Sequence, residues 1–242
     1  MAFRSSITIV ASPRPRVGKT LLARLVTGFH LHEGRLVAAF DLNAGEGTLL
    51  QFLPEQTTSA SVRDTSGQMA LFDHLVAHED TTKIIDLGHE SFEPFFSIAH
   101  KIGFVEEACR RAIAVAILFI ITPDQTSVEA YRRLRDRFAR TTLAPVHNEI
   151  LGPAQYRDRY PLTIGGAGIV HMPALAPGLR RYIDRPPFSF ADPNLGEVSG
   201  MSVDAHSELQ RWLRRIFLEF RELDLRILLA DLRSAIQFGS GT

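Results

Sequence analysis

The sequence predicts a doubly wound, mostly parallel α/β sheet with flanking helices, followed by a long C-terminal helix. Short apolar runs alternate along most of the chain with amphipathic stretches of helical spacing. The runs are apolar at nearly every position, as strands covered by helices on both faces of a sheet should be. After residue 203, one helical pattern continues to about residue 237. Alternating strands and helices are typical of a parallel sheet with helical crossovers.

Six apolar runs have the length and composition of buried strands, and four amphipathic segments lie between them. Gly34 is expected to end the first helix, because glycine adopts the left-handed conformation at helix C-termini. Thr126 and Glu129 have the spacing of a capping box at the start of the fourth helix. The expected strands are residues 7–11, 36–41, 83–87, 114–121, 143–148 and 168–172, and the expected helices are residues 19–31, 67–78, 92–111 and 127–140.

The chain is expected to divide into a core at residues 1–185, a loop at residues 186–203 and a helical segment at residues 204–242. Six apolar residues of that segment recur at steps of three and four, so they share one helix face that we expect to pack on the core. The alternatives are a helix that meets a partner or a second copy, and a helix at a membrane surface. Mixed charge on the polar face argues against a membrane, where Lys and Arg are favoured. The six residues are Leu209, Leu213, Ile216, Phe220, Leu223 and Ile227.

Composition and charge exclude several classes of protein. The chain has 242 residues, of which 45% are hydrophobic, so it can bury a sizeable core. Lys plus Arg and Asp plus Glu each number 27, so bulk charge does not favour coating nucleic acid. A single cysteine, Cys109, excludes a disulfide framework. The longest apolar run, residues 112–122, is about half of what a membrane-spanning helix needs, and no signal-peptide pattern is present, so we expect a cytoplasmic protein without a membrane partner.

The strongest functional signal is the segment 12–20, Ser-Pro-Arg-Pro-Arg-Val-Gly-Lys-Thr, which joins an apolar strand to an amphipathic helix. This is the context of a phosphate-binding loop, in which backbone N–H groups at a helix N-terminus surround a phosphate. Gly18 would let the backbone approach the phosphates without a Cβ clash. Lys19 would reach the β- and γ-phosphates, and the Thr20 hydroxyl would hold Mg²⁺. The first 32 residues also carry five basic side chains and no acidic one, which suits a polyanionic ligand.

Residues 14–20 resemble the deviant phosphate loop of the ParA/MinD family of partitioning and division-site ATPases, which has the pattern Lys-Gly-Gly-x-Gly-Lys-Thr. The resemblance covers about residues 5–185. Arg14 stands at the position of the family's signature lysine, and Pro15 and Arg16 replace its glycine pair. The resemblance implies ATP and Mg²⁺ as ligands, and a nucleotide-dependent homodimer in which Arg14, or else Arg16, reaches the partner's phosphates. An arginine there would be a planar, bidentate cation.

Single positions at the ends of expected strands extend the resemblance. Asp41 corresponds to the family's first switch, although it could also simply cap a strand end. Asp86 corresponds to the Walker B acid, with the same alternative, and would hold the hydration shell of Mg²⁺. Gly88 would lie beside the γ-phosphate. Asn148 corresponds to an asparagine that binds the adenine edge, and Pro173 to a loop that lines the base pocket.

The resemblance also predicts the speed of hydrolysis. In the family, a second acid follows two residues after the position of Asp41 and orients or deprotonates the attacking water, but this chain has Asn43. A neutral amide can position water but cannot accept a proton as a carboxylate does. Loss of a positioned base typically costs about 100- to 10,000-fold in rate. We therefore expect slow turnover, unless Glu46 of the same loop substitutes for the missing acid.

The phosphate loop predicts nucleotide binding, and the resemblance implies a slow ATPase whose nucleotide-switched dimer positions or partitions DNA or a protein complex, with an activating partner. One alternative is a metabolic ligase on the same scaffold, similar to dethiobiotin synthetase, which should have a small-molecule pocket opposite the γ-phosphate. Another is a nucleotide-binding regulatory scaffold with little turnover. The residues expected in catalysis are Lys19, Arg14, Asp41 and Asn43; those expected to bind nucleotide are Arg16, Val17, Gly18, Lys19, Thr20, Leu21, Gly88, Asn148 and Pro173; and those expected to hold Mg²⁺ are Thr20 and Asp86.

Overall fold

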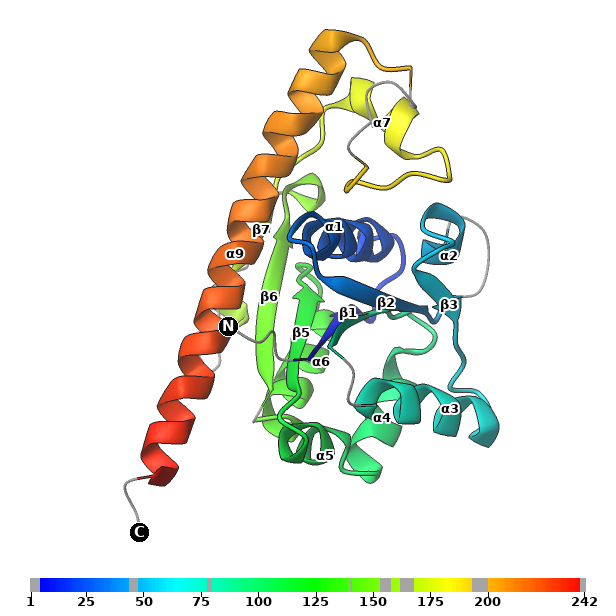
Figure 1. The fold of residues 1–242 in the computed structure, drawn as a ribbon. Helices are drawn as coiled ribbons and strands as arrows, with labels where there is room; N and C mark the ends of the chain where they lie inside the picture. The colour runs from blue at the N-terminus through cyan, green and yellow to red at the C-terminus, as the bar shows by residue number, and fades with distance from the viewer. Residues whose placement is uncertain are drawn as a thin grey trace.

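Seven parallel strands form one sheet, in the order β3-β2-β4-β1-β5-β6-β7, in the computed structural model (Figure 1). The structure describes residues 5–43, 48–77, 80–139, 141–152, 158–161, 168–192 and 200–239, and the side chains up to residue 229. The predicted fold class is confirmed. The strands are β1 (Ser6–Ala11), β2 (Leu36–Asp41), β3 (Thr57–Ser59), β4 (Thr81–Asp86), β5 (Ala114–Ile120), β6 (Thr142–Asn148) and β7 (Val170–Met172).

Six of these strands correspond to the predicted apolar runs, and β3 does not. β3 is three residues of sequence Thr-Thr-Ser, and two of them are exposed at the edge of the sheet. A strand this short and polar has no hydrophobic period by which the sequence could reveal it. Its pairing with β2 places Ser59 beside Asp41.

Helices connect successive strands and cover both faces of the sheet, as the crossover rule for parallel strands requires. The first long helix begins at Lys19, directly after the phosphate loop, and ends at His32; Gly34 follows two residues later with a φ of 71°, which confirms the predicted glycine after the helix C-terminus. The helices are α1 (Lys19–His32), α2 (Leu49–Phe52), α3 (Thr65–Val76), α4 (Phe92–Lys101), α5 (Phe104–Arg110), α6 (Gln125–Arg137), the short 3₁₀ helix η1 (Glu149–Leu151), α7 (Pro177–Ile183) and α9 (Val203–Gly239).

Two predicted helix features are wrong in detail. The expected single helix at residues 92–111 is two helices, because Gly103 adopts a φ of 65° and turns the chain between α4 and α5. The capping box at Thr126 and Glu129 does not form. Instead α6 begins two residues earlier, at Gln125, where the Asp124 carboxylate accepts a hydrogen bond from the Ser127 backbone N–H. Aspartate caps a helix N-terminus as well as serine or threonine does. Asp124 and Thr126 are only two residues apart, so their spacing in the sequence does not show which of them caps α6.

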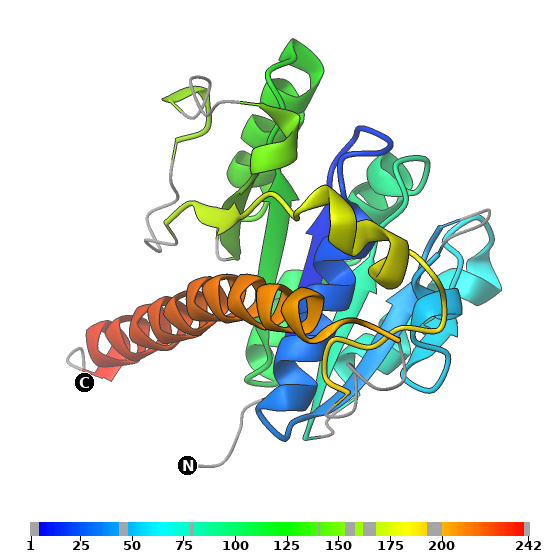
Figure 2. The ribbon, with the colours of Figure 1, turned by 90° about the horizontal axis from the view of Figure 1, so that it is seen from above.

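The sheet separates two hydrophobic cores (Figure 2). One core joins the sheet to α1, α2, α7 and α9, and the other joins it to α3, α4, α5 and α6. This arrangement explains why the central strands are buried on both faces, with Ile7 and Val10 of β1 fully buried on opposite sides. The phosphate-loop helix α1 therefore lies in the same layer as α9.

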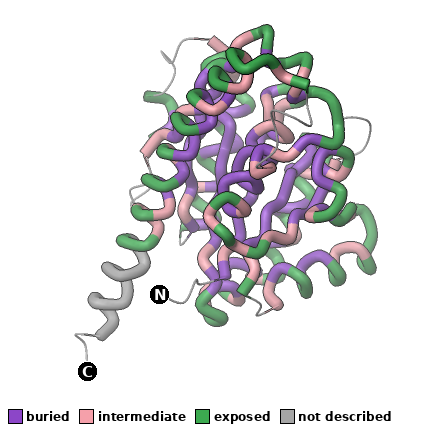
Figure 3. Tube along the Cα trace, turned by 45° about the horizontal axis from the view of Figure 1, so that its top comes forward, coloured by how far each residue is buried: buried purple, intermediate pink, exposed green. Residues whose placement is uncertain are grey.

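α9 packs along α1 with the predicted apolar face. Phe29 of α1 meets Phe217 and Phe220 of α9, with ring centroids 5.5 and 5.6 Å apart. Beside them Arg35, after α1, forms an ion pair with Asp224 at 2.7 Å. Figure 3 shows buried and exposed residues alternating along α9 up to the end of its described side chains. Within the part of the chain that the structure describes, no helix has the length and hydropathy that crossing a membrane requires.

Candidate functional site

The C-terminal ends of β1, β2 and β4 converge at one edge of the sheet, where parallel α/β sheets bind their ligands. The strand register places Asp41 of β2 directly beside Asp86 of β4, and Val10 of β1 on the other side of Asp86. The predicted phosphate loop follows β1 at this edge. Three strand ends therefore bring together the predicted loop and the two predicted acids.

The phosphate loop turns at two residues with left-handed backbone. Arg16 has a φ of 58° and Gly18 a φ of 96°. A side chain at Gly18 would also collide with the amide of Asn148, because an added Cβ would lie 2.8 Å from its Nδ2. Glycine is therefore required here both by backbone conformation and by close packing.

Lys19 is buried at the base of this loop, with 6% of its surface exposed. Its Nζ donates a hydrogen bond of 2.6 Å to the backbone carbonyl of Arg14, so the side chain folds back over the loop. Burial lowers the pKa of Lys19, and the charge of Asp86 acts in the opposite direction. A buried ammonium held by a single carbonyl in a basic loop favours an anion as its further partner.

Thr20 and Asp86 form the oxygen-rich corner of the site. The Thr20 hydroxyl donates to Asp86 Oδ2 at 2.6 Å, while Asp86 Oδ1 is buried and has no hydrogen-bond partner among the described residues. The pKa of Asp86 is raised to about 7, chiefly by burial; the Thr20 hydrogen bond lowers it and the neighbouring charge of Asp41 raises it. A hydroxyl and an orphaned carboxylate oxygen are hard donors of the kind that Mg²⁺ prefers, so these residues fit the ion.

Asp41 is held by its own loop. Its Oδ1 accepts hydrogen bonds from the backbone N–H and the side-chain Nδ2 of Asn43, both at 3.0 Å, and its Oδ2 accepts from the Leu50 backbone N–H at 2.9 Å. The Asn43 Nδ2 also lies 3.2 Å from the Asp86 carbonyl. Asp41 therefore fixes Asn43 beside β4. Glu46, the proposed substitute for the missing acid, lies outside the described residues.

Gly88 packs tightly against the loop that carries Asn43. An added Cβ at Gly88 would lie 2.7 Å from the Leu42 carbonyl and 3.1 Å from Asn43 Oδ1. Next to this contact, the loops after β2, β3 and β4 enclose a cavity of about 240 Å³. Arg63 and Glu90 form an exposed ion pair at its lining, 3.0 Å apart. Sequence reasoning missed this cavity, because its serine, arginine and glutamate side chains come from two separate loops, after β3 and after β4.

Arg14 is paired within its own chain. Its Nε and Nη2 both donate to Asp124 Oδ1, at 2.9 and 2.6 Å. Burial alone would raise the pKa of Asp124, but hydrogen bonds from Arg14 and Thr122 and the charge of Arg14 together lower it to about 2. Arg16 is exposed, and among the described residues its side chain has no hydrogen bond or ion pair. The sequence analysis did not identify Asp124, because the only feature that indicates its role is its position directly before α6.

Asn148, Pro173 and Leu21 were also predicted to bind nucleotide, and each has a structural contact. The Asn148 Nδ2 donates to the Val17 carbonyl at 3.0 Å, so this amide supports the loop directly. The Pro173 carbonyl accepts from the Trp212 indole N–H at 3.0 Å, which ties the predicted base loop to α9. Leu21 is partly buried and packs against the hydrophobic core of the α1 layer.

Comparison with known proteins identifies the fold. No protein-family model matches the chain, and no curated protein matches its sequence. Among solved structures, the MinC:MinD cell division protein complex of Aquifex aeolicus has a TM-score of 0.51 at 15% identity, over 88% of this chain and 95% of that chain.

Two further solved structures are similar over most of this chain. The MinD cell division protein of Aquifex aeolicus has a TM-score of 0.46 at 16% identity, over 87% of this chain and 97% of that one. The signal recognition particle 54 kDa protein of Aeropyrum pernix, in complex with GDP, has a TM-score of 0.48 at 16% identity, over 87% of this chain and 49% of that one. The sheet topology, the loop geometry and the likeness to the MinC:MinD complex show that the chain has the fold of the P-loop NTPases.

Proposed function

We propose that this protein is a ParA/MinD-like ATPase that binds ATP with Mg²⁺ at residues 12–20 and forms a homodimer in the bound state. The observation that carries the proposal is the arrangement of Lys19, Thr20 and Asp86. A buried amine, a hydroxyl and a carboxylate with an orphaned oxygen meet at the N-terminus of α1, where backbone N–H groups add a partial positive charge.

Each of these residues has a separate task. The Lys19 ammonium exchanges the Arg14 carbonyl for phosphate oxygens, and their negative charge offsets the burial that lowers its pKa. Gly18 leaves the space in which the loop backbone approaches the phosphates. Thr20 and Asp86 hold Mg²⁺, which when bound supplies charge neutralisation for the terminal phosphates.

Slow hydrolysis is part of this proposal. Asp41 and the Asp86 carbonyl engage the amide nitrogen of Asn43, which leaves its Oδ1 facing Gly88. That oxygen can accept a hydrogen bond from water but cannot take up a proton. The bound state therefore persists, and a long-lived ATP dimer suits a protein that positions DNA or a protein cargo until an activating partner arrives.

Replacing Lys19 with Ala tests the nucleotide site. ATP binding measured by calorimetry should be lost, because the amine has no counterpart elsewhere in the loop. Lys101→Ala is a matched control, since Lys101 lies exposed in the last turn of α4 and should leave ATP affinity unchanged. Equal affinity in Lys19→Ala and the wild type would remove the proposed site.

A second candidate function has its own observation. The cavity of about 240 Å³ beside Gly88 and Asn43 lies where a ligase similar to dethiobiotin synthetase would place a small molecule. ATP turnover separates the candidates. Stimulation by DNA favours the partitioning ATPase, stimulation only by small carboxylic acids or amines favours the ligase, and no turnover under either condition favours a regulatory scaffold.

A further inference from the structure

The acid that holds Arg14 lies in the junction between β5 and α6, residues 122–125, and both of its carboxylate oxygens have partners. Asp124 Oδ1 accepts from Arg14 and, at 3.1 Å, from the Ser127 backbone N–H. Asp124 Oδ2 accepts from the Thr122 hydroxyl at 2.6 Å. A partly exposed ion pair gains little when two mobile side chains must be ordered to form it. Because Asp124 is already fixed in direction, only Arg14 has to be ordered.

A tyrosine from a distant part of the chain fixes the position of Thr122. The Tyr160 hydroxyl donates to the Thr122 carbonyl at 2.6 Å and accepts from the Thr122 backbone N–H at 3.4 Å. The ladder between β5 and β6 ends at Ile120, so strand pairing does not extend to these two buried backbone groups. Buried N–H and C=O groups require hydrogen-bond partners, and this one hydroxyl serves both. The backbone of Thr122 therefore follows the position of Tyr160.

Tyr160 is itself held in one place. The residue is 2% exposed, and its ring packs edge-on against Tyr131 of α6, with ring centroids 5.2 Å apart. Next to it, the Tyr131 hydroxyl donates to the Pro161 carbonyl at 2.9 Å. Edge-to-face aromatic pairs have a preferred geometry, which restricts the ring. The segment at residues 158–161 is thus anchored on α6 and on the junction together.

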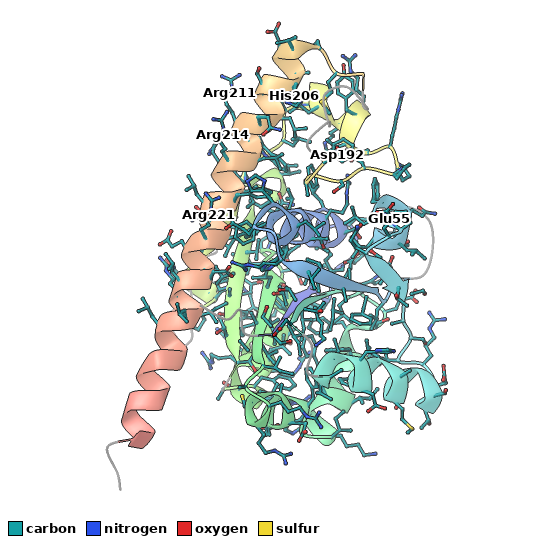
Figure 4. All side chains as sticks on the ribbon, viewed as in Figure 1. Glu55, Asp192, His206, Arg211, Arg214 and Arg221 are labelled. Atoms are coloured by element: carbon teal, nitrogen blue, oxygen red, sulfur yellow. The ribbon has the colours of Figure 1, made fainter. Side chains whose placement is uncertain are left out.

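Arg159 holds the same junction from the solvent side. Other exposed arginines extend into solvent, and Figure 4 shows Arg211 and Arg214 of α9 pointing away from the sheet. Arg159 is also exposed, yet its guanidinium donates to the Pro123 carbonyl at 2.7 Å and to Gln125 Oε1 at 2.6 Å. Residues 159 and 160 together therefore hold the junction on both sides of its acid.

We propose that Tyr160 is a positioning residue for Arg14: with Arg159 it keeps the junction where Asp124 holds Arg14, and so limits how often Arg14 can turn to a phosphate. The last step rests on the proposed function, in which a phosphate is the alternative partner of Arg14. The contacts run without a gap from Tyr160 through Thr122 and Asp124 to Arg14. A shift of the junction alone is enough to weaken the pair.

Hydrogen exchange at the Arg14 Nε–H, followed by nitrogen-15 NMR without nucleotide, tests the positioning. This proton lies in the 2.9 Å hydrogen bond to Asp124, so its exchange rate reports how often the pair opens. Tyr160→Phe keeps the ring and removes the hydroxyl. It should speed exchange up to about fivefold, the most that a partly exposed pair protects. Arg159→Ala should act in the same direction, and Arg14→Lys identifies the resonance by its loss.

Two variants at other sites are matched controls for this experiment. Tyr182→Phe removes a tyrosine hydroxyl that accepts a hydrogen bond from Arg181, and Arg211→Ala truncates another exposed arginine. Both should leave exchange at the Arg14 Nε–H at the wild-type rate. A wild-type rate in Tyr160→Phe would overturn the proposal. Should that variant fail to fold, Arg159→Ala decides in the same way, because its position is exposed and its truncation should leave the fold intact.

A double-variant cycle shows whether Tyr160 acts through Asp124. Asp124→Asn should speed exchange by itself, because the charge that holds Arg14 is gone. Tyr160→Phe should add nothing in that background, since two changes to one contact are not additive. An acceleration by Tyr160→Phe that persists undiminished in the Asp124→Asn background would show that the hydroxyl only stabilises the fold, and would exclude the positioning role.

Sedimentation with ATP and Mg²⁺ tests the step from Arg14 to assembly. Tyr160→Phe should tighten the ATP-dependent dimer in the same direction as Asp124→Asn, because both changes free Arg14. A dimer that Asp124→Asn tightens and Tyr160→Phe does not would contradict this step. If the wild type does not dimerise with ATP, the proposed function fails instead, and the exchange rates measured without nucleotide still decide whether Tyr160 positions Arg14.

Discussion

Arg14 of the phosphate loop donates two hydrogen bonds to one oxygen of Asp124, which lies 110 positions later at the start of α6. The arginine that we propose to reach the phosphates across the dimer is thus held by an acid of its own chain. For Arg14 to reach a phosphate of either subunit, this pair must open. Asp124 therefore opposes the nucleotide-dependent dimer that we propose.

Asp124→Asn should strengthen ATP-dependent dimerisation. The amide keeps an oxygen for the Ser127 N–H but loses the charge that holds Arg14. Because both side chains are about a third exposed, each pair is worth no more than about 1 kcal/mol; the homodimer opens two such pairs, so it should tighten up to about 30-fold. Sedimentation with and without ATP and Mg²⁺ measures this association. Arg14→Ala should weaken the dimer, and equal weakening by Asp124→Asn would show that the pair supports assembly.

Stability of the nucleotide-free protein should depend on pH through Asp86. Burial raises its folded pKa to about 7 from an ordinary value of 3.8. Between these values the folded state binds more protons than the unfolded state, so this group's contribution falls as pH rises from about 4 to about 7 and is constant above. The loss is on the order of 4 kcal/mol.

Asp86→Asn should flatten this dependence, since an amide does not titrate. The measurement is the free energy of unfolding in urea from pH 4 to pH 8, taken as wild type minus variant so that other groups cancel. A pH-independent difference would contradict a buried, protonated carboxyl. Mg²⁺ should restore stability at pH 8 in the wild type and have no effect on the variant, because Mg²⁺ binds the ionised carboxylate.

Asn43→Asp should speed ATP hydrolysis without tightening ATP binding. A carboxylate can accept the proton of the attacking water, for a gain of about 100-fold or more. The same change replaces a donor to Asp41 by a like charge, so the variant should lose about 1–3 kcal/mol of stability. Single-turnover rates at saturating ATP measure the gain. If the rate does not change, Asn43 is not at the water, and Glu46→Gln becomes the next variant to test.

The core-facing stripe of α9 should be essential for stability. Ile216 of α9 is fully buried in the hydrophobic core that α9 shares with α1. Ile216→Ala should therefore lower the free energy of unfolding by about 2–5 kcal/mol. Leu36→Ala is the control, because Leu36 is 68% exposed and its truncation should change stability by less than about 0.5 kcal/mol. Urea unfolding measures both. A tolerated Ile216→Ala would identify α9 as a detachable element.

Local patterns were sufficient for most of the fold. Apolar runs and helical spacing predicted six of the seven strands, the start of α1 at Lys19 and the length of α9, because burial imposes a period on each element. The same reasoning failed at β3, at Gly103 and at the cap of α6. Three polar residues form β3, one glycine separates α4 from α5, and one acid caps α6. None of these residues belongs to a repeating pattern.

The sequence by itself determined the strand-loop-helix unit at residues 12–20, since loop, glycine and helix start are neighbours in the chain. Only the tertiary structure decided what surrounds that unit. The pairing of Arg14 with Asp124 and the contact of Thr20 with Asp86 join residues 110 and 66 positions apart. The raised pKa of Asp86 depends on the burial that the whole sheet creates. Distances and burial of this kind arise from packing of the complete chain, so no local pattern of residues encodes them.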